Sequence, residues 1–426
     1  MIFQDEHWGD NPDQYEPGPM DSVVNPNKLH ESYVKCSKSV NWKGSVQRYG
    51  LSELSNINSI IRMVNNGTYQ LDDPYEFILN ERGHNRYIKA LTIMDRVLQR
   101  SFNDNILTPA IMPYLIHDNG ASQKGKGVSF SRERFKYHLR EAYFEYGGEA
   151  YIMFIDFSKY FDNILHEEIL KQFRPLMTEV EYNFLCITFQ SFDVDISYLS
   201  DEEAANFKDS LFNMLEYCQL DRKLFTGEKM YPKSVGIGNQ TSQATGIFYP
   251  HEIDNYCKIV KGIKYYGRYM DDTYIIMRTK EELRALLAEI EQICIRLGIH
   301  INPKKTRIQP ITTEVTYLKI NYRIFPTGRI LQIVPNHIFA REKHNINKFH
   351  DLYLAGRMSI IDAIQCFLSW QGAYAKFDSK NKVYAMECYF KDKFGIMRTE
   401  DLHEILHYLI KWENERINDP RRLRMF

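Results

Sequence analysis

The segment YYGRYMDDTYIIMR, residues 265–278, constrains the fold of this chain more than any other. It sets two adjacent carboxylates, Asp271 and Asp272, between two runs of aromatic and β-branched residues. The pattern predicts a strand, a tight turn and a second strand, with both aspartates at the turn. Two neighbouring carboxylates repel each other and raise each other's pKa unless a cation lies between them. The pair is therefore either a hairpin tip in open water or a site for a hard cation, and this segment alone does not decide between the two.

The chain contains a second pair of this kind, Asp72 and Asp73, immediately before Pro74. Polar residues before a proline are typical of a solvated turn, and no further function is needed to explain them. The two pairs differ in their neighbours, since only the pair at 271–272 is enclosed by strand-forming residues on both sides.

The bulk composition limits the classes of protein that fit. A length of 426 residues allows two or three domains, and a net charge of −1 means that any basic surface must be local. The seven cysteines are scattered singly, without the C-x-x-C spacing of a zinc site, so reduced thiols are expected. Neither a signal pattern nor a membrane-length apolar run is seen, which predicts a cytoplasmic protein without a membrane partner.

The order of predicted elements favours an α+β fold with helices on one face of a sheet. A strand ends near residue 156, the hairpin covers 265–278, and a helix with its apolar residues on one face follows from about 280 to Gly298. We predict an N-terminal extension over 1–75, a central domain over 76–334 with an acidic insertion at 173–230, and a helical region with a C-terminal tail over 335–426.

A basic, glycine-containing loop lies between residues 120 and 140. It holds six Lys or Arg residues, Lys124 and Lys126 among them, against the single acid Glu133. Such a run is often only a solvated helix face. Here Gly125 and Gly127 separate the lysines, which favours a loop that approaches a polyanion closely.

Asp156 ends a strongly apolar strand in EAYIMFIDF. It is either a cap for the next helix or a third carboxylate beside Asp271 and Asp272. Three carboxylates on neighbouring strands would hold two divalent ions about 3.5–4 Å apart, the arrangement that serves in-line phosphoryl displacement. Mg²⁺ suits such a site, with Mn²⁺ as an alternative.

Five segments in order resemble the motifs of reverse transcriptases. IDFSKYFDNILH looks like motif A, IGNQTSQ like motif B, YMDDTYII like the Y-x-D-D box of motif C, and NPKKTRI like motif D. NGASQKGKG resembles a fingers loop of bacterial retroelement polymerases. The resemblance spans roughly residues 80–325 and implies a right-hand polymerase with fingers, a palm and a helical thumb.

The resemblance assigns roles to matching positions. Asp156 and Asp271 match metal ligands, Asp272 a partial ligand, and the Phe157 carbonyl an additional one. Lys305, or Lys304 in its place, matches the general acid toward pyrophosphate.

Further matches concern the nucleotide and the nucleic acid. Phe161 matches the aromatic gate against a 2′-hydroxyl, or is a core aromatic. Arg86 matches the fingers arginine on the triphosphate, or is a surface strand residue. Trp370 in the thumb either follows a duplex or packs in a core. The matches to the loop that supports the base and template are Gly238, Asn239 and Gln243, with Thr241 or Ser242 as the expected helix cap.

Two positions depart from the family pattern. Ile237 stands where most members carry glutamine, a change shared with diversity-generating retroelement enzymes, and it removes a polar contact near the nucleotide. Lys319 stands where the primer grip has glycine.

The resemblance implies an RNA-directed DNA polymerase of bacterial or phage origin that uses dNTPs and forms an RNA–DNA duplex. Near-neutral charge favours a dedicated non-coding RNA template and a role in antiphage defence. The insertion and the N-terminal extension are suited to contact with a second subunit or another copy of the chain. The alternatives are a mutagenic enzyme of a diversity-generating retroelement and a template-independent or protein-primed DNA polymerase.

Overall fold

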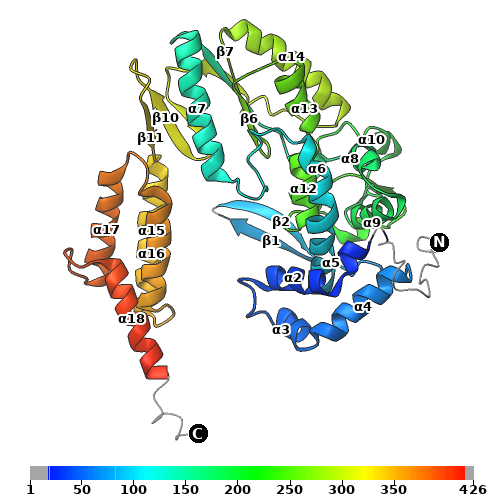
Figure 1. Cartoon of the computed structure of the whole chain (residues 1–426), viewed down its shortest axis with the longest axis horizontal. Coiled ribbons are helices and arrows are strands. Elements are labelled where there is room, and N and C mark those ends of the chain that lie inside the picture. Colours follow the sequence, from blue (N-terminus) through cyan, green and yellow to red (C-terminus); the bar gives the residue numbers. More distant parts are fainter. Residues whose placement is uncertain (1–17, 19, 82, 418–426) are drawn as a thin grey trace, which may run out of the picture. The chain divides into compact units, whose positions relative to one another are not determined.

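The computed structural model describes residues 18, 20–81 and 83–417, which form two compact units (Figure 1). The first unit contains the chain up to Arg134 together with Tyr151–Gln309, and the second contains Phe135–Ala150 and the chain from Pro310. The predicted N-terminal extension and C-terminal tail lie partly outside the described residues.

The first unit combines many helices with short strands. Its helices are α1 (Asp21–Val24), α2 (Pro26–Ser37), α3 (Gly44–Leu51), α4 (Glu53–Asn65), α5 (Ile93–Phe102), α6 (Thr108–Ile111), α8 (His166–Phe173), α9 (Glu179–Gln190), α10 (Asp201–Ala205), α11 (Met214–Tyr217), α12 (Gln240–Phe248), α13 (His251–Asn255) and α14 (Lys280–Arg296). Its strands are β1 (Tyr75–Glu81), β2 (His84–Ala90), β3 (Tyr151–Ile155), β4 (Val194–Asp195), β5 (Met230–Tyr231), β6 (Tyr266–Tyr269), β7 (Asp272–Met277) and β8 (Arg307–Pro310). Helix α7 (Val128–Tyr146) crosses the division between the units.

A four-stranded sheet with the order β6-β7-β3-β8 is the centre of the first unit. Strand β7 pairs antiparallel with both β6 and β3. In the β3–β7 register Ile155 lies opposite Thr273, so Asp156 and Asp272 follow at the same end of the sheet. The predicted strand before Asp156 and the predicted hairpin are both present, but the prediction that both aspartates lie at the turn was wrong, because Asp272 is the first residue of β7 and pairs with Tyr269.

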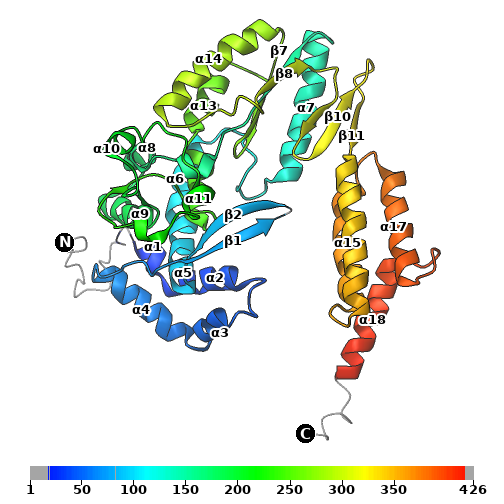
Figure 2. The same cartoon turned by 180° about the vertical axis from the view of Figure 1, so that it is seen from behind.

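Helix α14 packs against β3 and β7 because its apolar residues share one face (Figure 2). Leu283, Leu286, Ile290 and Cys294 are buried on that face. Thr279 and Glu282 form a reciprocal capping box at its start, and Gly298 takes a left-handed φ of 65° just beyond its end. The prediction of this helix and its end is confirmed.

The predicted insertion contains two small strands and several short helices with an apolar cluster of their own. Val194, Ile196, Phe207, Phe212 and Met214 are its buried members.

The second unit contains a sheet of order β11-β10-β9 and four helices. Its strands are β9 (Val315–Tyr317), β10 (Ile320–Ile324) and β11 (Ile330–Ile333), and its helices are α15 (Asn336–Leu354), α16 (Ile360–Tyr374), α17 (Lys380–Phe394) and α18 (Leu402–Ile417). The predicted helical region from residue 335 is therefore present. In the β9–β10 turn Lys319 has a φ of 67°, a conformation that glycine adopts without strain.

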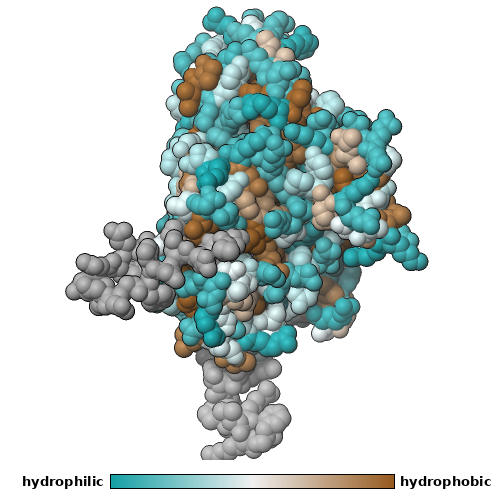
Figure 3. All heavy atoms as spheres, turned by 90° about the vertical axis from the view of Figure 1, so that its right-hand side faces the viewer, coloured by the Kyte–Doolittle hydropathy of each residue, from teal (hydrophilic) through white to brown (hydrophobic). Residues whose placement is uncertain are grey.

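The face drawn in Figure 3 is largely hydrophilic, with separate apolar patches. Among the described residues, no helix combines the length and the apolarity that crossing a bilayer requires. The mixture of helices with antiparallel strands confirms the α+β prediction.

Candidate active site

A cleft of about 450 Å³ lies at the sheet end that carries the aspartates. Asp156 follows β3, and Asp271 lies in the two-residue turn between β6 and β7. The other residue of that turn, Met270, has a left-handed φ of 56°, which is strained for a side chain of its size. Strained turns of this kind are concentrated at functional sites. The residues that line the cleft include Arg86, Asp156, Phe157, Tyr160, Phe161, Asp162, Ile237, Asp271, Asn302 and Lys305.

The carboxylates in and beside the cleft affect one another. The pKa of Asp271 is raised, first by burial and then by repulsion from Asp156. The pKa of Asp272 is raised to about 6, first by desolvation and then by Asp271 and Asp156, although the residue reaches solvent. Both shifts mean that the ionised pair is disfavoured without a cation.

Asp156 already has partners within this cleft. The Lys305 ammonium lies 3.0 Å from Oδ1 of Asp156, and the Asn302 side chain donates to Oδ2 at 3.2 Å. The backbone N–H of Asn302 also donates to the Asp156 carbonyl at 2.8 Å. The loop after α14 therefore fixes the orientation of this carboxylate and supplies one cation to it.

The residues fit a divalent cation by donor chemistry. Carboxylate oxygens are the ligands that Mg²⁺ prefers, and the raised pKa values of Asp271 and Asp272 indicate negative charge that is only partly compensated. Within the described part of the chain, no three His, Cys, Asp or Glu side chains are gathered closely enough to form a metal site. Asp156, Asp271 and Asp272 remain predicted ligands, as does the carbonyl of buried Phe157 in the cleft wall.

A buried ion pair between Arg268 and Asp254 supports the turn between β6 and β7 that contains Asp271. Arg268 and Asp254 are both fully buried, and the guanidinium donates to both carboxylate oxygens, at 2.8 and 2.6 Å. The same guanidinium donates to the carbonyls of Met270 at 3.0 Å and Ile247 at 2.7 Å. Arg268 thereby joins the strained turn to α12 and α13. The sequence analysis did not identify this pair, although a charge inside each of two apolar segments was a visible signal.

The gate candidate Phe161 lies in the cleft against α12. A Cβ atom on Gly246 would come within 2.9 Å of its ring, so glycine is needed for this close packing. The Tyr160 ring meets Phe161 edge-on, and the Tyr160 hydroxyl donates to the Gly246 carbonyl at 2.9 Å. Gly246 and Tyr160 therefore pack against the Phe161 ring where it lines the cleft.

The basic residues that were predicted to act on the triphosphate and the pyrophosphate differ in their positions. Arg86 of β2 lines the cleft, lowers the pKa of Asp271, and lies 2.9 Å from Glu81. Lys305 also lines the cleft, whereas Lys304 is not part of its lining.

The glycine-rich turn before α12 divides the predicted nucleotide-binding residues between two cavities. Ile237 lines the carboxylate cleft, whereas Gly238, Asn239 and Gln243 line a separate cavity. The expected cap of α12 was wrong. Asn239 is the cap, and its side chain accepts from the Ser242 N–H at 2.7 Å and hydroxyl at 2.6 Å.

The predicted nucleic-acid contacts are also in different surroundings. Lys124 is exposed and lines the separate cavity. The Lys126 ammonium donates to the carbonyls of His117 and Asn119, at 2.9 and 3.1 Å, so its loop already engages it. Trp370 is half-buried, and its ring packs against Phe339, Phe367 and Tyr374.

These features place Asp156, Asp271 and Asp272 at one end of an antiparallel sheet. Residues 243–322 match the family described as "Reverse transcriptase (RNA-dependent DNA polymerase)". The matched segment contains Asp271, Asp272 and Lys305 and runs from α12 into β10. The matched family is the one that the sequence motifs predicted.

The fold is similar to that of a solved structure of telomerase from Candida albicans in complex with a TWJ fragment of telomeric RNA. The two chains share 12% identity with a TM-score of 0.39, and the match covers 76% of this chain. The chain spans 60% of the length of that telomerase chain. No curated protein matches the sequence.

Proposed function

We propose that this chain is an RNA-directed DNA polymerase that copies a dedicated non-coding RNA. The main support is that Asp156 and the turn with Asp271 lie at the same end of one sheet, and that residues 243–322, which include Asp271 and Asp272, match the reverse transcriptase family. Bound Mg²⁺ ions would activate the primer 3′-hydroxyl and stabilise the leaving pyrophosphate.

The chain's own residues would position the reactants. Asp156 and Asp271 would hold the cations, with Asp272 beside them. Arg86 would bind the triphosphate by charge-assisted hydrogen bonds, and Lys305 would donate a proton to pyrophosphate. Because Gly246 and Tyr160 fix the Phe161 ring, that ring would exclude a 2′-hydroxyl from the sugar site.

A role in antiphage defence is the biological part of the proposal. A chain with a net charge of −1 is poorly suited to capture arbitrary nucleic acid, because non-specific binding depends on excess cationic charge. The chain is better suited to one structured RNA, and the insertion, which packs around an apolar cluster of its own, would be the part that contacts a partner protein.

The test is to sequence the nucleic acid that copurifies with the wild-type protein and with Asp271→Ala/Asp272→Ala. We expect one RNA with both proteins and complementary DNA only with the wild type. DNA that is unchanged in the variant would overturn the proposed site, and absence of any complementary DNA would overturn the proposed activity.

The error pattern of the DNA tests the biological role. Faithful copies support defence, whereas errors concentrated at one template base would support diversification. DNA without a complementary RNA would favour template-independent or protein-primed synthesis.

A further inference from the structure

The insertion at 173–230 forms part of the wall of the carboxylate cleft. Three of its residues, Leu211, Met214 and Leu215, line the cleft together with Phe161. Met214 also belongs to the apolar cluster of the insertion, so the packing of that cluster determines where this wall lies. The side chains of the wall are apolar, and a hydroxyl that met them would lose its hydrogen bonds with water.

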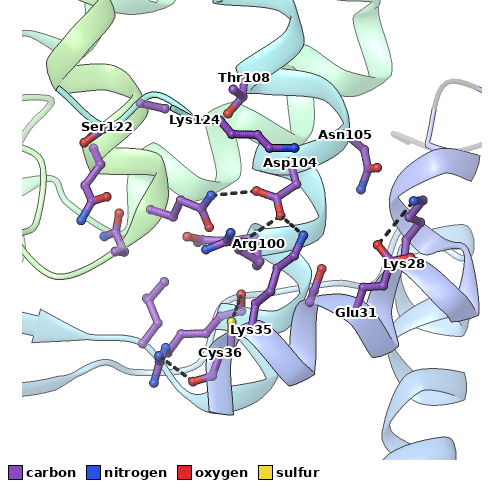
Figure 4. A pocket seen from close by; sticks show the side chains of 18 of the residues that line it. Lys28, Glu31, Lys35, Cys36, Arg100, Asp104, Asn105, Thr108, Ser122 and Lys124 are labelled. Atoms are coloured by element: carbon purple, nitrogen blue, oxygen red, sulfur yellow. Dashed lines mark hydrogen bonds and ion pairs between the residues drawn. The ribbon is translucent and has the colours of Figure 1, made fainter. Parts of the chain in front are cut away.

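The insertion borders only one of the two cavities beside the glycine-rich turn. The separate cavity is drawn in Figure 4, where Lys35, Arg100 and Lys124 enter it from three different elements. Its described lining contains no residue of the insertion, whereas the lining of the carboxylate cleft contains three. The insertion is therefore placed to affect the space in which the nucleotide would react, and not the separate cavity.

A buried amide joins the insertion to the turn that carries Phe161. Asn163 is 2% exposed, its Oδ1 accepts from the Phe212 N–H at 2.8 Å, and its Nδ2 donates to the Phe212 carbonyl at 3.0 Å. Asparagine carries an acceptor and a donor on one short side chain, so it can pair with both backbone groups of one residue. Phe212 is also a buried member of the apolar cluster of the insertion, so this pairing links the turn to the core of the insertion.

The residue beside this amide makes a second link to the insertion. Oδ2 of Asp162 accepts from the Met214 N–H at 3.1 Å. The turn that carries Phe161 begins at Lys159, whose φ of 46° is left-handed, and Nδ2 of Asn163 also donates to the Lys159 carbonyl at 2.9 Å. A strained turn persists only where its surroundings determine it, and the hydrogen bonds with the insertion are part of those surroundings.

A buried lysine outside the insertion anchors the segment that leads to Phe212. Lys233 is fully buried, and its ammonium donates to the carbonyls of Phe207, Lys208 and Ser210 at 3.0, 3.1 and 2.7 Å. These carbonyls replace water around the charge, without which its burial would be very costly. The position of the insertion beside the cleft is therefore fixed at two points, by the ammonium of Lys233 and by the amide that binds Phe212.

We propose that the insertion is a positioning element for sugar selection. Asn163 and Lys233 hold the segment 211–215 against the turn of Phe161, so that the Phe161 ring and the apolar wall together exclude a 2′-hydroxyl. This inference rests on the proposed function, because such a gate has a role only in a polymerase that selects dNTPs. It adds that selection depends on a segment outside the five family-like motifs, and that Asn163 is a positioning residue that acts through Phe161.

The test is single-nucleotide extension of a primer on an RNA template, measured as the ratio of kcat/KM for a dNTP to kcat/KM for the matching rNTP. Asn163→Ala removes both hydrogen bonds to Phe212, and this ratio should fall about tenfold because the ring no longer excludes the 2′-hydroxyl reliably. The control Asn56→Ala removes the hydrogen bond of a half-buried amide to the Tyr49 carbonyl outside the cleft, and should leave the ratio unchanged. A purely structural role for Asn163 would lower both kcat/KM values alike and would leave the ratio as in the wild type.

Two further variants show through which residues the effect passes. In a Phe161→Ala background, Asn163→Ala should change the ratio no further, because the amide acts through the ring. Lys233→Met keeps the amide and removes the anchor of the insertion, so the ratio should fall here too. If this variant does not fold, Phe212→Leu, which alters the insertion side of the same contact, takes its place. An unchanged ratio in Asn163→Ala, or in the variant that loosens the insertion, would overturn the proposal, as would a full effect of Asn163→Ala in the absence of the Phe161 ring.

Hydrogen exchange tests the contact without any activity. In Asn163→Ala the Phe212 N–H loses its acceptor, so exchange should rise at 211–215 while α14 exchanges as in the wild type. Unchanged exchange at 211–215 would overturn the proposed link. If exchange rises there and the wild type adds no nucleotide to any primed template, the proposed polymerase function fails, and sugar selection fails with it while the link stands. If the wild type makes DNA and Asn163→Ala keeps the wild-type ratio, only the role in sugar selection fails.

Discussion

The two Asp-Asp pairs of this chain share a dipeptide and differ in surroundings. Asp72 and Asp73 are exposed before β1, where the Asp72 carboxylate accepts from the Thr92 hydroxyl at 3.1 Å. That contact ties a loop to the start of α5. Asp271 and Asp272 instead lie at a strained turn beside a third carboxylate.

The difference between the pairs comes from the neighbouring strand. Strand β3 brings Asp156 to the end of β7, whereas β1 is exposed along its length and pairs only with β2. The dipeptide therefore does not determine its chemistry. A third carboxylate on an adjacent strand is what would make the turn with Asp271 a cation site.

The largest difference between the pairs should be in catalysis. Asp271→Asn/Asp272→Asn removes cation ligands, and we expect RNA-templated primer extension to fall on the order of 10³-fold or more. Asp72→Asn/Asp73→Asn should stay within a few-fold of wild type. Equal losses of primer-extension activity in both double variants would show that the two Asp-Asp pairs do not differ in catalytic role.

The second largest difference should come from the residues that hold each pair in position, namely Arg268 at the Asp271–Asp272 turn and Thr92 at Asp72. Arg268→Lys keeps a cation against Asp254 and loses the hydrogen bond to the Met270 carbonyl, so kcat should fall about tenfold with little change in KM for dNTP. Arg268→Ala leaves a buried charge unpaired, and should cost about 3–5 kcal/mol in the free energy of unfolding.

Thr92→Val provides the matched change at the other pair. It removes the cap of α5 and the hydroxyl contact with Asp72, at a cost of about 1 kcal/mol, with kcat unchanged. A kcat for Arg268→Lys equal to that of wild type would contradict a positioning role for Arg268.

Thermal stability without metal gives a smaller contrast. Asp272→Asn removes a carboxylate whose charged form is disfavoured in the fold, so its melting temperature should rise by roughly 2–4 °C at neutral pH. Mg²⁺ should stabilise the wild type and stabilise this variant less. Asp73→Asn should change neither value, and a Mg²⁺ shift that survives in Asp272→Asn would remove this residue from the site.

The smallest effect should be on pH dependence. Asp272 has a folded pKa of about 6, above the value of about 3.9 for an unfolded chain, so its contribution to metal-free stability is present below pH 4 and is lost as pH rises to about 6. Mg²⁺ binds the ionised carboxylate, so the Mg²⁺-induced shift should weaken as pH falls through 6. The check is a melting series from pH 5 to 8 with and without Mg²⁺, and a shift independent of pH would contradict the raised pKa.

The features that the sequence predicted well were those with a local signal. The hairpin around Asp271, the strand before Asp156 and the capped helix α14 each follow from periodicity and end signals within one segment. The contacts of Arg268 with Asp254 and of Asn302 with Asp156 join different segments, and although the charges stand out in their own segments, no pattern within one segment predicts which residues pair. The hydrogen bond from Lys126 to the His117 carbonyl in its own loop could not be predicted either, because the glycines of this loop permit several backbone paths.

The most direct test of the cation site is anomalous scattering from crystals grown with Mn²⁺. We predict a peak within about 2.5 Å of carboxylate oxygens of both Asp156 and Asp271, with the Lys305 ammonium displaced from its position 3.0 Å from Asp156. Asp72 and Asp73 in the same crystal should show no peak. A cleft without manganese, with Lys305 still paired to Asp156, would contradict the assignment and leave Asp271 and Asp272 as a polar hairpin tip.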